Sequence, residues 1–198
     1  MLIALEGSAK TIEGGKNETG GQYNDYYVQK TLRLAPTPKM YHRGPAAGSF
    51  GYSMINIRVM ANAATTFIGS NGGKVFLVGW SRGAAACIQA AHDLKKSGGK
   101  KIDAMFLFDP VDMDSSTDDN LDFIPDSVIN VYHATATKKS RFINIFPTCG
   151  KTQASNINAV RGYFDTSHSG VAGGPDGDDG SWGWMYNHML RSGVFNRS

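Results

Sequence analysis

The sequence predicts an α/β fold, in which a mainly parallel β-sheet is covered by helices on both faces. Short apolar runs alternate along the chain with longer segments of helical periodicity, as in sheets whose strands are joined through helices. The five strands that we expect are residues 2–5, 74–78, 104–108, 128–133 and 160–164. A chain of 198 residues with 24 glycines suits one compact domain over residues 1–198, with little or no room for a cap.

Two segments carry the helical pattern most clearly. Residues 55–67 place apolar side chains at positions 55, 59, 63 and 67, which lie on one face of a helix. Residues 82–96 form a second, alanine-rich helix that Ser97, Gly98 and Gly99 end. The Asp-rich residues 109–126 and the Gly/Asp-rich residues 170–183 are expected to be surface loops, where sheets of this kind place their sites.

Composition and charge exclude several classes of function. The formal net charge of +3 is small and basic residues cluster only locally, as within residues 95–101, so no basic stripe for nucleic acid is present. The sequence contains no run of about 18 apolar residues, the length needed to cross a bilayer, and residues 1–5 lack the features of a signal peptide. We therefore expect a soluble protein, cytoplasmic or secreted, without stable membrane insertion. Two cysteines, Cys87 and Cys149, form no disulfide framework.

The central motif is Gly79-Trp80-Ser81-Arg82-Gly83, a G-x-S-x-G pattern between an expected strand and an expected helix. A sharp strand-to-helix turn strains the backbone of the central residue, and glycines on either side remove side chains that would clash. Such a turn exposes a serine above the sheet, at the positive end of a helix dipole. The motif in this context predicts an α/β-hydrolase fold with Ser81 as the nucleophile.

A serine hydroxyl needs a base, and the order of the chain selects among five histidines. In α/β-hydrolases the serine precedes the acid and the acid precedes the histidine, which removes His42 and His92. We favour His168, which follows the last expected strand and precedes a glycine-rich loop. His133, at a strand end, stays open as an alternative, and so does His188, which is expected in a helix among aromatic residues.

The acid that orients the base is predicted to be Asp109. It directly follows the strand after the elbow helix, and successive parallel strands tend to be neighbours with their carboxyl ends at one edge. A carboxylate at a buried strand end also needs a partner, whereas a carboxylate in a solvated loop does not. Asp112, Asp114 and Asp165 are the rivals.

The oxyanion that forms on the substrate needs N–H donors. The first is expected from the backbone of Arg82, at the start of the elbow helix, and the second from Gly7 or Ser8, after the first strand. A plain turn at Gly7 and Ser8 is an equally good interpretation. We expect Trp80, Tyr41 and Trp182 to contact substrate, although an aromatic core is the commoner role of residues such as Trp182.

Six blocks carry a family resemblance. They are residues 2–8 (LIALEGS), 41–44 (YHRG), 79–84 (GWSRGA), 106–111 (FLFDPV), 132–134 (YHA) with 141–142 (RF), and 168–174 (HSGVAGG). In this order they resemble the DUF2235 family, which includes the catalytic domains of type VI secretion phospholipase effectors. The resemblance implies an α/β-hydrolase fold, a triad of Ser81, Asp109 and His168, and lipolytic or esterase activity; it also gives His133 a block other than that of the catalytic histidine.

The sequence departs from the family at two places. Glu6-Gly7-Ser8 stands where the family usually has Asp-Gly-Thr, and Lys138 and Lys139 replace the carboxylate usual after the His-Ala block. The first departure bears on the second oxyanion donor. The short chain leaves little room for a lid, so small soluble esters are favoured over long-chain lipids.

The predicted chemistry is hydrolysis of a carboxylic ester through an acyl-enzyme, on short to medium acyl chains. It requires no cofactor and no metal. Residues 69–74 lack the spacing of a phosphate loop, and Asp176, Asp178 and Asp179 lack the spacing of a calcium loop. The alternatives are a phospholipase acting on membrane lipids and a non-catalytic relative of the fold that binds a lipid or a partner protein. The sequence leaves acyl-chain length, the preference among ester, phospholipid and thioester, and the oligomeric state open.

Overall fold

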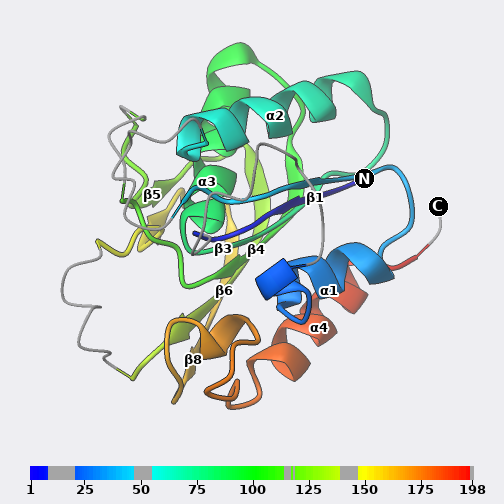
Figure 1. The fold of residues 1–198 in the computed structure, drawn as a ribbon. Helices are drawn as coiled ribbons and strands as arrows, with labels where there is room; N and C mark the ends of the chain where they lie inside the picture. Colours follow the sequence, from blue (N-terminus) through cyan, green and yellow to red (C-terminus); the bar gives the residue numbers. More distant parts are fainter. Residues whose placement is uncertain (9–20, 47–54, 114–116, 118, 139–146, 197–198) are drawn as a thin grey trace.

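The computed structural model describes residues 1–8, 21–46, 55–113, 117, 119–138 and 147–196. Their core is a six-stranded parallel sheet in the order β2-β1-β3-β4-β6-β8 (Figure 1). The strands are β1 (Leu2–Leu5), β2 (Lys39–His42), β3 (Phe76–Trp80), β4 (Ile102–Phe108), β6 (Val128–Ala136) and β8 (Asn158–Phe164). Two short strands, β5 (Phe123–Ile124) and β7 (Thr152–Gln153), form a separate parallel pair. The predicted α/β class is confirmed.

All five expected strands are present, and their bounds differ from the prediction in a way that matters for the site. The strand expected at 74–78 runs instead from Phe76 to Trp80, so it reaches the residue before Ser81. The prediction was wrong at Val75, whose N–H donates to the side chain of Asp103 (2.8 Å) outside the regular pairing of strands. The edge strand β2 was not predicted, because its four half-buried residues show no apolar alternation.

The described residues form four α-helices beside the sheet. They are α1 (Tyr27–Leu34), α2 (Ile57–Ser70), α3 (Arg82–Ser97) and α4 (Ser181–Ser192). The two helices predicted most clearly are α2 and α3; α2 begins two residues later than expected, after Asn56, whose side chain accepts the N–H of Val59. The expected loop 170–183 is wrong in part, because it contains a 3-10 turn at Gly170–Ala172 and the first turn of α4.

The two faces of the sheet have different cores. One face, which we call the alanine face, packs against α2 and α3, and many of its helical core residues are alanines. The other, the aromatic face, packs against α1 and α4 and contains most of the buried aromatic residues. Figure 1 shows the two helix pairs on opposite sides of the sheet. Side chains alternate between the faces along each strand, so Leu5 lies on the alanine face and Ala4 on the aromatic one.

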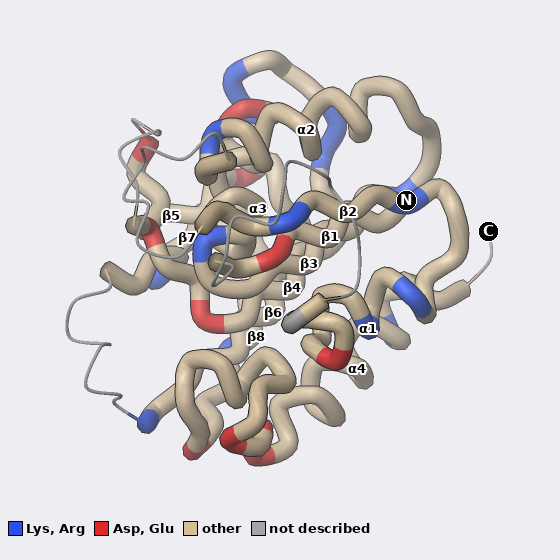
Figure 2. The backbone as a smooth tube through the Cα atoms, in the orientation of Figure 1, with Lys and Arg blue, Asp and Glu red and all other residues tan. Residues whose placement is uncertain are grey.

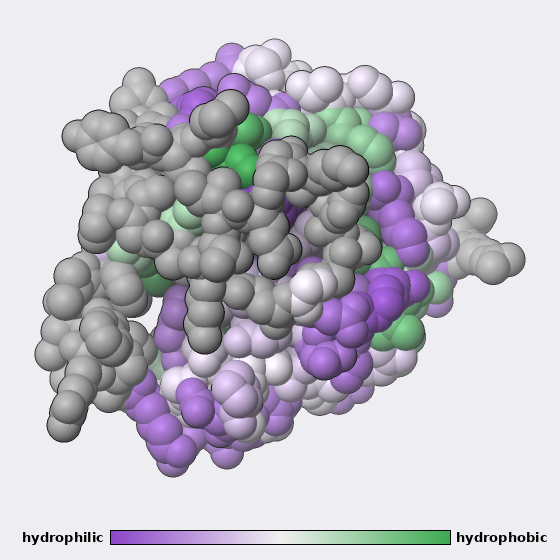
Figure 3. Space-filling view, in the orientation of Figure 1, coloured by the Kyte–Doolittle hydropathy of each residue, from purple (hydrophilic) through white to green (hydrophobic). Residues whose placement is uncertain are grey.

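The surface mixes both signs of charge. Lys and Arg positions are spread among Asp and Glu positions along the described tube (Figure 2). Hydrophilic residues cover α1, and hydrophobic ones are visible beside α2 (Figure 3). Within the described part of the chain, the helices are too short or too polar to cross a bilayer.

Candidate active site

Ser81 lies at a sharp turn between β3 and α3, as the motif predicts. Its backbone has φ 54° and ψ −125°, a conformation that is strained for a residue with a side chain. The flanking glycines allow this turn, because a Cβ on Gly79 would lie 2.7 Å from the Ala84 nitrogen and one on Gly83 would lie 2.2 Å from the Leu5 oxygen. The turn therefore has the backbone geometry that the motif predicts, but Ser81 is only 5% exposed, so the expectation of an exposed serine is wrong.

Backbone hydrogen bonds fix Ser81 beside the end of β4. The Ser81 N–H donates to the Phe108 oxygen (3.0 Å), and the Val111 N–H donates to the Ser81 oxygen (3.2 Å). These two partners flank Asp109, which follows β4 directly and has a positive φ of 43°. Ser81 is thus hydrogen-bonded to the chain on both sides of Asp109, the residue predicted as the acid.

Asp109 binds His168 across 59 residues of sequence. The Asp109 Oδ2 and the His168 Nδ1 lie 2.7 Å apart, a distance typical of a charge-assisted hydrogen bond. The Asp109 side chain is 6% exposed and the His168 side chain 20%. Because an ionised carboxylate only accepts hydrogen bonds, this contact assigns the proton of a neutral imidazole to Nδ1 and leaves Nε2 as the acceptor.

The His168 loop is also tied to the elbow. The indole N–H of Trp80 donates to the backbone oxygen of His168 (3.0 Å), and the two rings have centroids 5.4 Å apart. Since Trp80 directly precedes Ser81, this contact holds the histidine loop against the nucleophile turn. The structure therefore brings the neighbourhoods of Ser81, Asp109 and His168 together at the carboxyl ends of β3, β4 and β8.

The other histidines have different surroundings. His133 is buried, and this burial lowers its pKa to about 4. His188 lies in α4 with its ring against Tyr132 and Trp184, as expected for a helix residue among aromatics. Among the rival acids, Asp165 is mostly exposed and lies 3.7 Å from Lys138. Asp114 and Lys139 lie outside the described residues.

The predicted oxyanion donors lie together next to the elbow. Arg82 is the first residue of α3, and N–H groups at the start of a helix have no acceptor within the helix. The side chain of Arg82 is buried, and its Nε donates to the Ser8 Oγ (2.7 Å). A Cβ on Gly7 would lie 2.5 Å from the Trp80 ring, so Gly7 approaches the elbow closely.

The Gly7 N–H has a partner that the sequence did not suggest. It donates to the Oε1 of Glu6 at 3.2 Å. Glu6 is completely buried, and desolvation raises its pKa to about 8 against the opposing effects of hydrogen bonds from Gly7 and Tyr41. Sequence reasoning treated Glu6 only as a departure from a motif. The available signal was a carboxyl group directly after four apolar strand residues, a position where burial is expected.

The three residues predicted to contact substrate, Trp80, Trp182 and Tyr41, lie in three different parts of the structure. Trp80 is buried beside His168. Trp182 lies in the first turn of α4 and packs against α1, with its ring centroid 4.8 Å from that of Tyr27 and 4.2 Å from the Lys30 Nζ. Its contacts are thus those of aromatic packing, the commoner role weighed above.

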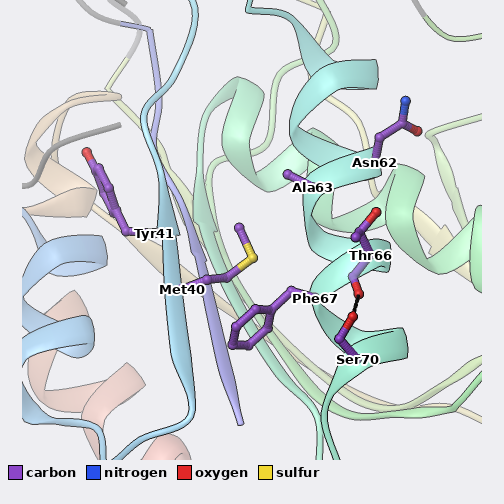
Figure 4. A pocket seen from close by; sticks show the side chains of 7 residues that line it. All are labelled: Met40, Tyr41, Asn62, Ala63, Thr66, Phe67 and Ser70. Carbon is purple, nitrogen blue, oxygen red and sulfur yellow. Dashed lines mark hydrogen bonds between the residues drawn. The ribbon is translucent and has the colours of Figure 1, made fainter. Parts of the chain in front are cut away.

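Tyr41 lies on the edge strand β2, where its hydroxyl accepts a hydrogen bond from Gln29 (3.2 Å). It also lines a hollow of about 520 Å³ between β2 and α2, whose other lining residues are Met40, Asn62, Ala63, Thr66, Phe67 and Ser70. In Figure 4 the Tyr41 ring lies on the opposite side of β2 from Phe67. None of the predicted catalytic residues lines this hollow.

Acidic residues near the site have protein partners. Asp178 accepts the Tyr27 hydroxyl (2.7 Å) and the Trp182 N–H (3.0 Å), and the backbone N–H of Asp165 donates to Asp179. Among the residues that the structure describes, no group of three or more His, Cys, Asp and Glu side chains could hold a metal ion.

Comparison with known proteins shows the fold. No protein-family model matches the chain. No curated protein matches it either. A protein of Pectobacterium atrosepticum described as a YdeN-like hydrolase has a similar structure, with a TM-score of 0.54 at 12% identity over 98% of this chain and 91% of that one. The fold is of the α/β-hydrolase type. RedJ, in a structure with PEG in its active site, aligns over 96% of this chain and 91% of its own at 11% identity, with a TM-score of 0.49.

Proposed function

We propose that this α/β-hydrolase-type chain is a serine hydrolase that cleaves carboxylic esters with short to medium acyl groups. The observation that carries the proposal is the 2.7 Å contact between His168 and Asp109, beside an elbow that holds Ser81 at a positive φ. A buried carboxylate that orients a partly exposed imidazole next to a strained serine is the arrangement that nucleophilic catalysis requires.

In the proposed mechanism, the His168 Nε2 takes the proton of the Ser81 hydroxyl as Ser81 Oγ attacks the ester carbonyl carbon. Asp109 holds the Nδ1 proton and stabilises the imidazolium that forms. N–H groups of Arg82 and of the Gly7–Ser8 turn bind the oxyanion. The alcohol leaves with the proton from His168, and a water molecule, activated by the same nitrogen, then releases the acid from Ser81.

The family resemblance supports the same chemistry and adds a second candidate. The DUF2235-like blocks, to which no family model adds support, favour phospholipids as substrates. Our expectation from the length of the given sequence, that little room remains for a lid, favours small esters instead. We therefore rank short to medium esters first and phospholipids second, with a non-catalytic binding protein as the alternative without activity.

The test is hydrolysis of p-nitrophenyl esters of two to sixteen carbons by the wild type and by Ser81→Ala, with a fluorophosphonate probe located by mass spectrometry. The proposal expects turnover that falls with chain length and a label on Ser81, both lost in the variant. Turnover that rises on phospholipid vesicles would select the phospholipase. Folded wild type with neither turnover nor label would exclude the triad and leave the binding protein.

A further inference from the structure

Glu6 lies beside the oxyanion site and has no part in the mechanism above. It is the residue before Gly7, its side chain is completely buried, and its Oε1 accepts the Gly7 N–H. The second oxygen, Oε2, is buried with no hydrogen-bond partner. An ionised carboxylate in this position costs free energy, because one of its oxygens lacks both solvation and a hydrogen bond. The environment therefore favours the neutral acid.

The backbone around Glu6 leaves little freedom to move. Its N–H donates to the His42 oxygen (3.0 Å). A Cβ on Gly44 would lie 2.6 Å from the Glu6 backbone oxygen, and one on Gly83 would lie 2.5 Å from it, so two other backbone segments approach this peptide closely. The protonation of the side chain is then the property that can change while the loop stays in place.

We propose that Glu6 is a positioning residue of the oxyanion site: as a neutral acid it releases the Gly7 N–H to the substrate oxyanion, and as a carboxylate it retains that N–H and repels the oxyanion. The inference rests on the proposed function. The physical basis is the strength of the competing bonds. A hydrogen bond to a carboxylate is about twice as strong as one to a neutral group, so only the neutral acid yields the donor readily.

The groups around Glu6 make the neutral form accessible near pH 7. Burial raises the pKa of Glu6 to about 8, while hydrogen bonds from Gly7 and Tyr41 act in the opposite direction. Burial, and after it the Glu6 charge, raises the pKa of Tyr41 on β2 and of Tyr26 before α1, so both stay neutral in this range. Of the charged groups nearby, Tyr23 raises the pKa of Tyr41 and Arg43 lowers it, both to a smaller extent. The Arg82 guanidinium on α3 donates hydrogen bonds to the Ser8 hydroxyl and to the Ala46 oxygen (2.7 Å). His42, the last residue of β2, faces its own loop, with Nδ1 2.7 Å from the Arg43 oxygen.

The experiment measures kcat and KM for a short p-nitrophenyl ester from pH 6 to pH 10, corrected for the spontaneous rate. Wild type, Glu6→Gln and Asp126→Asn are compared; Asp126 is a half-exposed carboxylate that gives a matched acid-to-amide control. We expect the wild-type kcat to fall about tenfold between pH 7 and pH 9.5 with KM little changed. Glu6→Gln should keep its pH 7 activity within about threefold and lose the alkaline fall, and Asp126→Asn should follow the wild type.

Several outcomes would overturn the inference. An alkaline fall that persists in Glu6→Gln would show that another group causes it. A flat wild-type profile, with turnover and Ser81 labelling intact, would remove the role of Glu6 and leave the proposed function standing. Absence of turnover and label at every pH would remove both.

A second measurement covers the case in which Glu6→Gln does not fold. In the wild type, the carboxyl carbon of Glu6 is titrated by ¹³C NMR, and the rate of fluorophosphonate labelling of Ser81 is measured over the same pH range, since phosphonylation also develops charge on an oxygen in the oxyanion site. The inference expects the labelling rate to fall with the same midpoint as the Glu6 carboxyl. Labelling that is unchanged through that midpoint would contradict it.

Discussion

The alanine face and the aromatic face of the sheet serve the candidate site in different ways. On the alanine face, α3 lies so close to β1 that a single Cβ on Gly83 would collide with two backbone oxygens. On the aromatic face, large rings fill the space between sheet and helices, and the Trp80 ring lies beside that of His168. The nucleophile is thus positioned by backbone packing and the base by side-chain contacts.

This difference predicts that the two faces respond differently to mutation. Backbone packing cannot adjust to an added side chain, so changes at the elbow should reduce stability. Side-chain contacts can be removed one at a time, so changes around His168 should reduce activity while the protein stays folded.

The largest expected effect on activity is that of Asp109→Asn. The amide replaces the acceptor that fixes the Nδ1 proton of His168, so the imidazole adopts the wrong tautomer, and kcat/KM should fall on the order of 10⁴-fold. Steady-state kinetics and circular dichroism of the same preparation check this. A loss below about tenfold in folded protein would assign the orienting role to another acid, and Asp112→Asn, at the rival position, is the comparison.

Gly83→Ala tests the alanine face. The new Cβ would meet the Leu5 and Glu6 oxygens at 2.2 and 2.5 Å, and we expect a loss of about 3 kcal/mol or more in the free energy of unfolding. The matched control is Gly69→Ala near the end of α2, where a Cβ has open space. That change should stabilise the protein by up to about 1 kcal/mol. Denaturant unfolding measures both, and equal effects at the two glycines would break the comparison.

His133 gives the alanine face a dependence on acid. Burial lowers its pKa to about 4 from 6.5, so between these values the unfolded chain binds a proton that the folded one does not. The contribution of His133 to stability is therefore full above pH 6.5, and on the order of 3 kcal/mol of it should be lost as the pH drops toward 4.

The variant His133→Leu should flatten the acid fall in unfolding free energy, measured by denaturant titration from pH 4 to pH 7. It also removes an Nδ1 that is buried without a hydrogen-bond partner. The acid fall should become steeper in Glu6→Gln, because burial raises the pKa of Glu6 from 4.5 to about 8, so that Glu6 increases stability as the pH falls through this range and opposes the effect of His133. An unchanged acid fall in His133→Leu would assign it to other groups.

Strong local patterns made much of this fold predictable from the sequence. The apolar run before Gly79 and the alanines after Ser81 predicted a strand and a helix that the structure has, although β3 ends two residues later than expected. The pairing of Asp109 with His168 followed from chain order and from the convergence of parallel strands at one edge. These predictions depend on local pattern or topology, which a single sequence contains.

Features that depend on tertiary packing were not predictable. The short strand β2 has no periodicity of its own and exists because it pairs with β1. The packing of the Trp182 ring against Tyr27 is a contact between α1 and α4 that no local pattern encodes. The close approach of Gly44 and Gly83, which are distant in sequence, to the backbone oxygen of Glu6 was not predictable either.

The smallest expected effect is that of Trp80→Phe on the aromatic face. The ring packing against Tyr23 and Tyr26 is largely retained, but the 3.0 Å hydrogen bond from the indole to the His168 oxygen is lost. One such bond contributes about 1 kcal/mol, so the free energy of unfolding should fall by about that amount, and kcat/KM should fall roughly fivefold because the His168 loop is held less firmly. Tyr163→Phe, at an exposed position on β8, is the control and should match the wild type. A loss of stability without a loss of activity in Trp80→Phe would mean that the aromatic face supports the fold alone, and that the position of His168 depends only on Asp109.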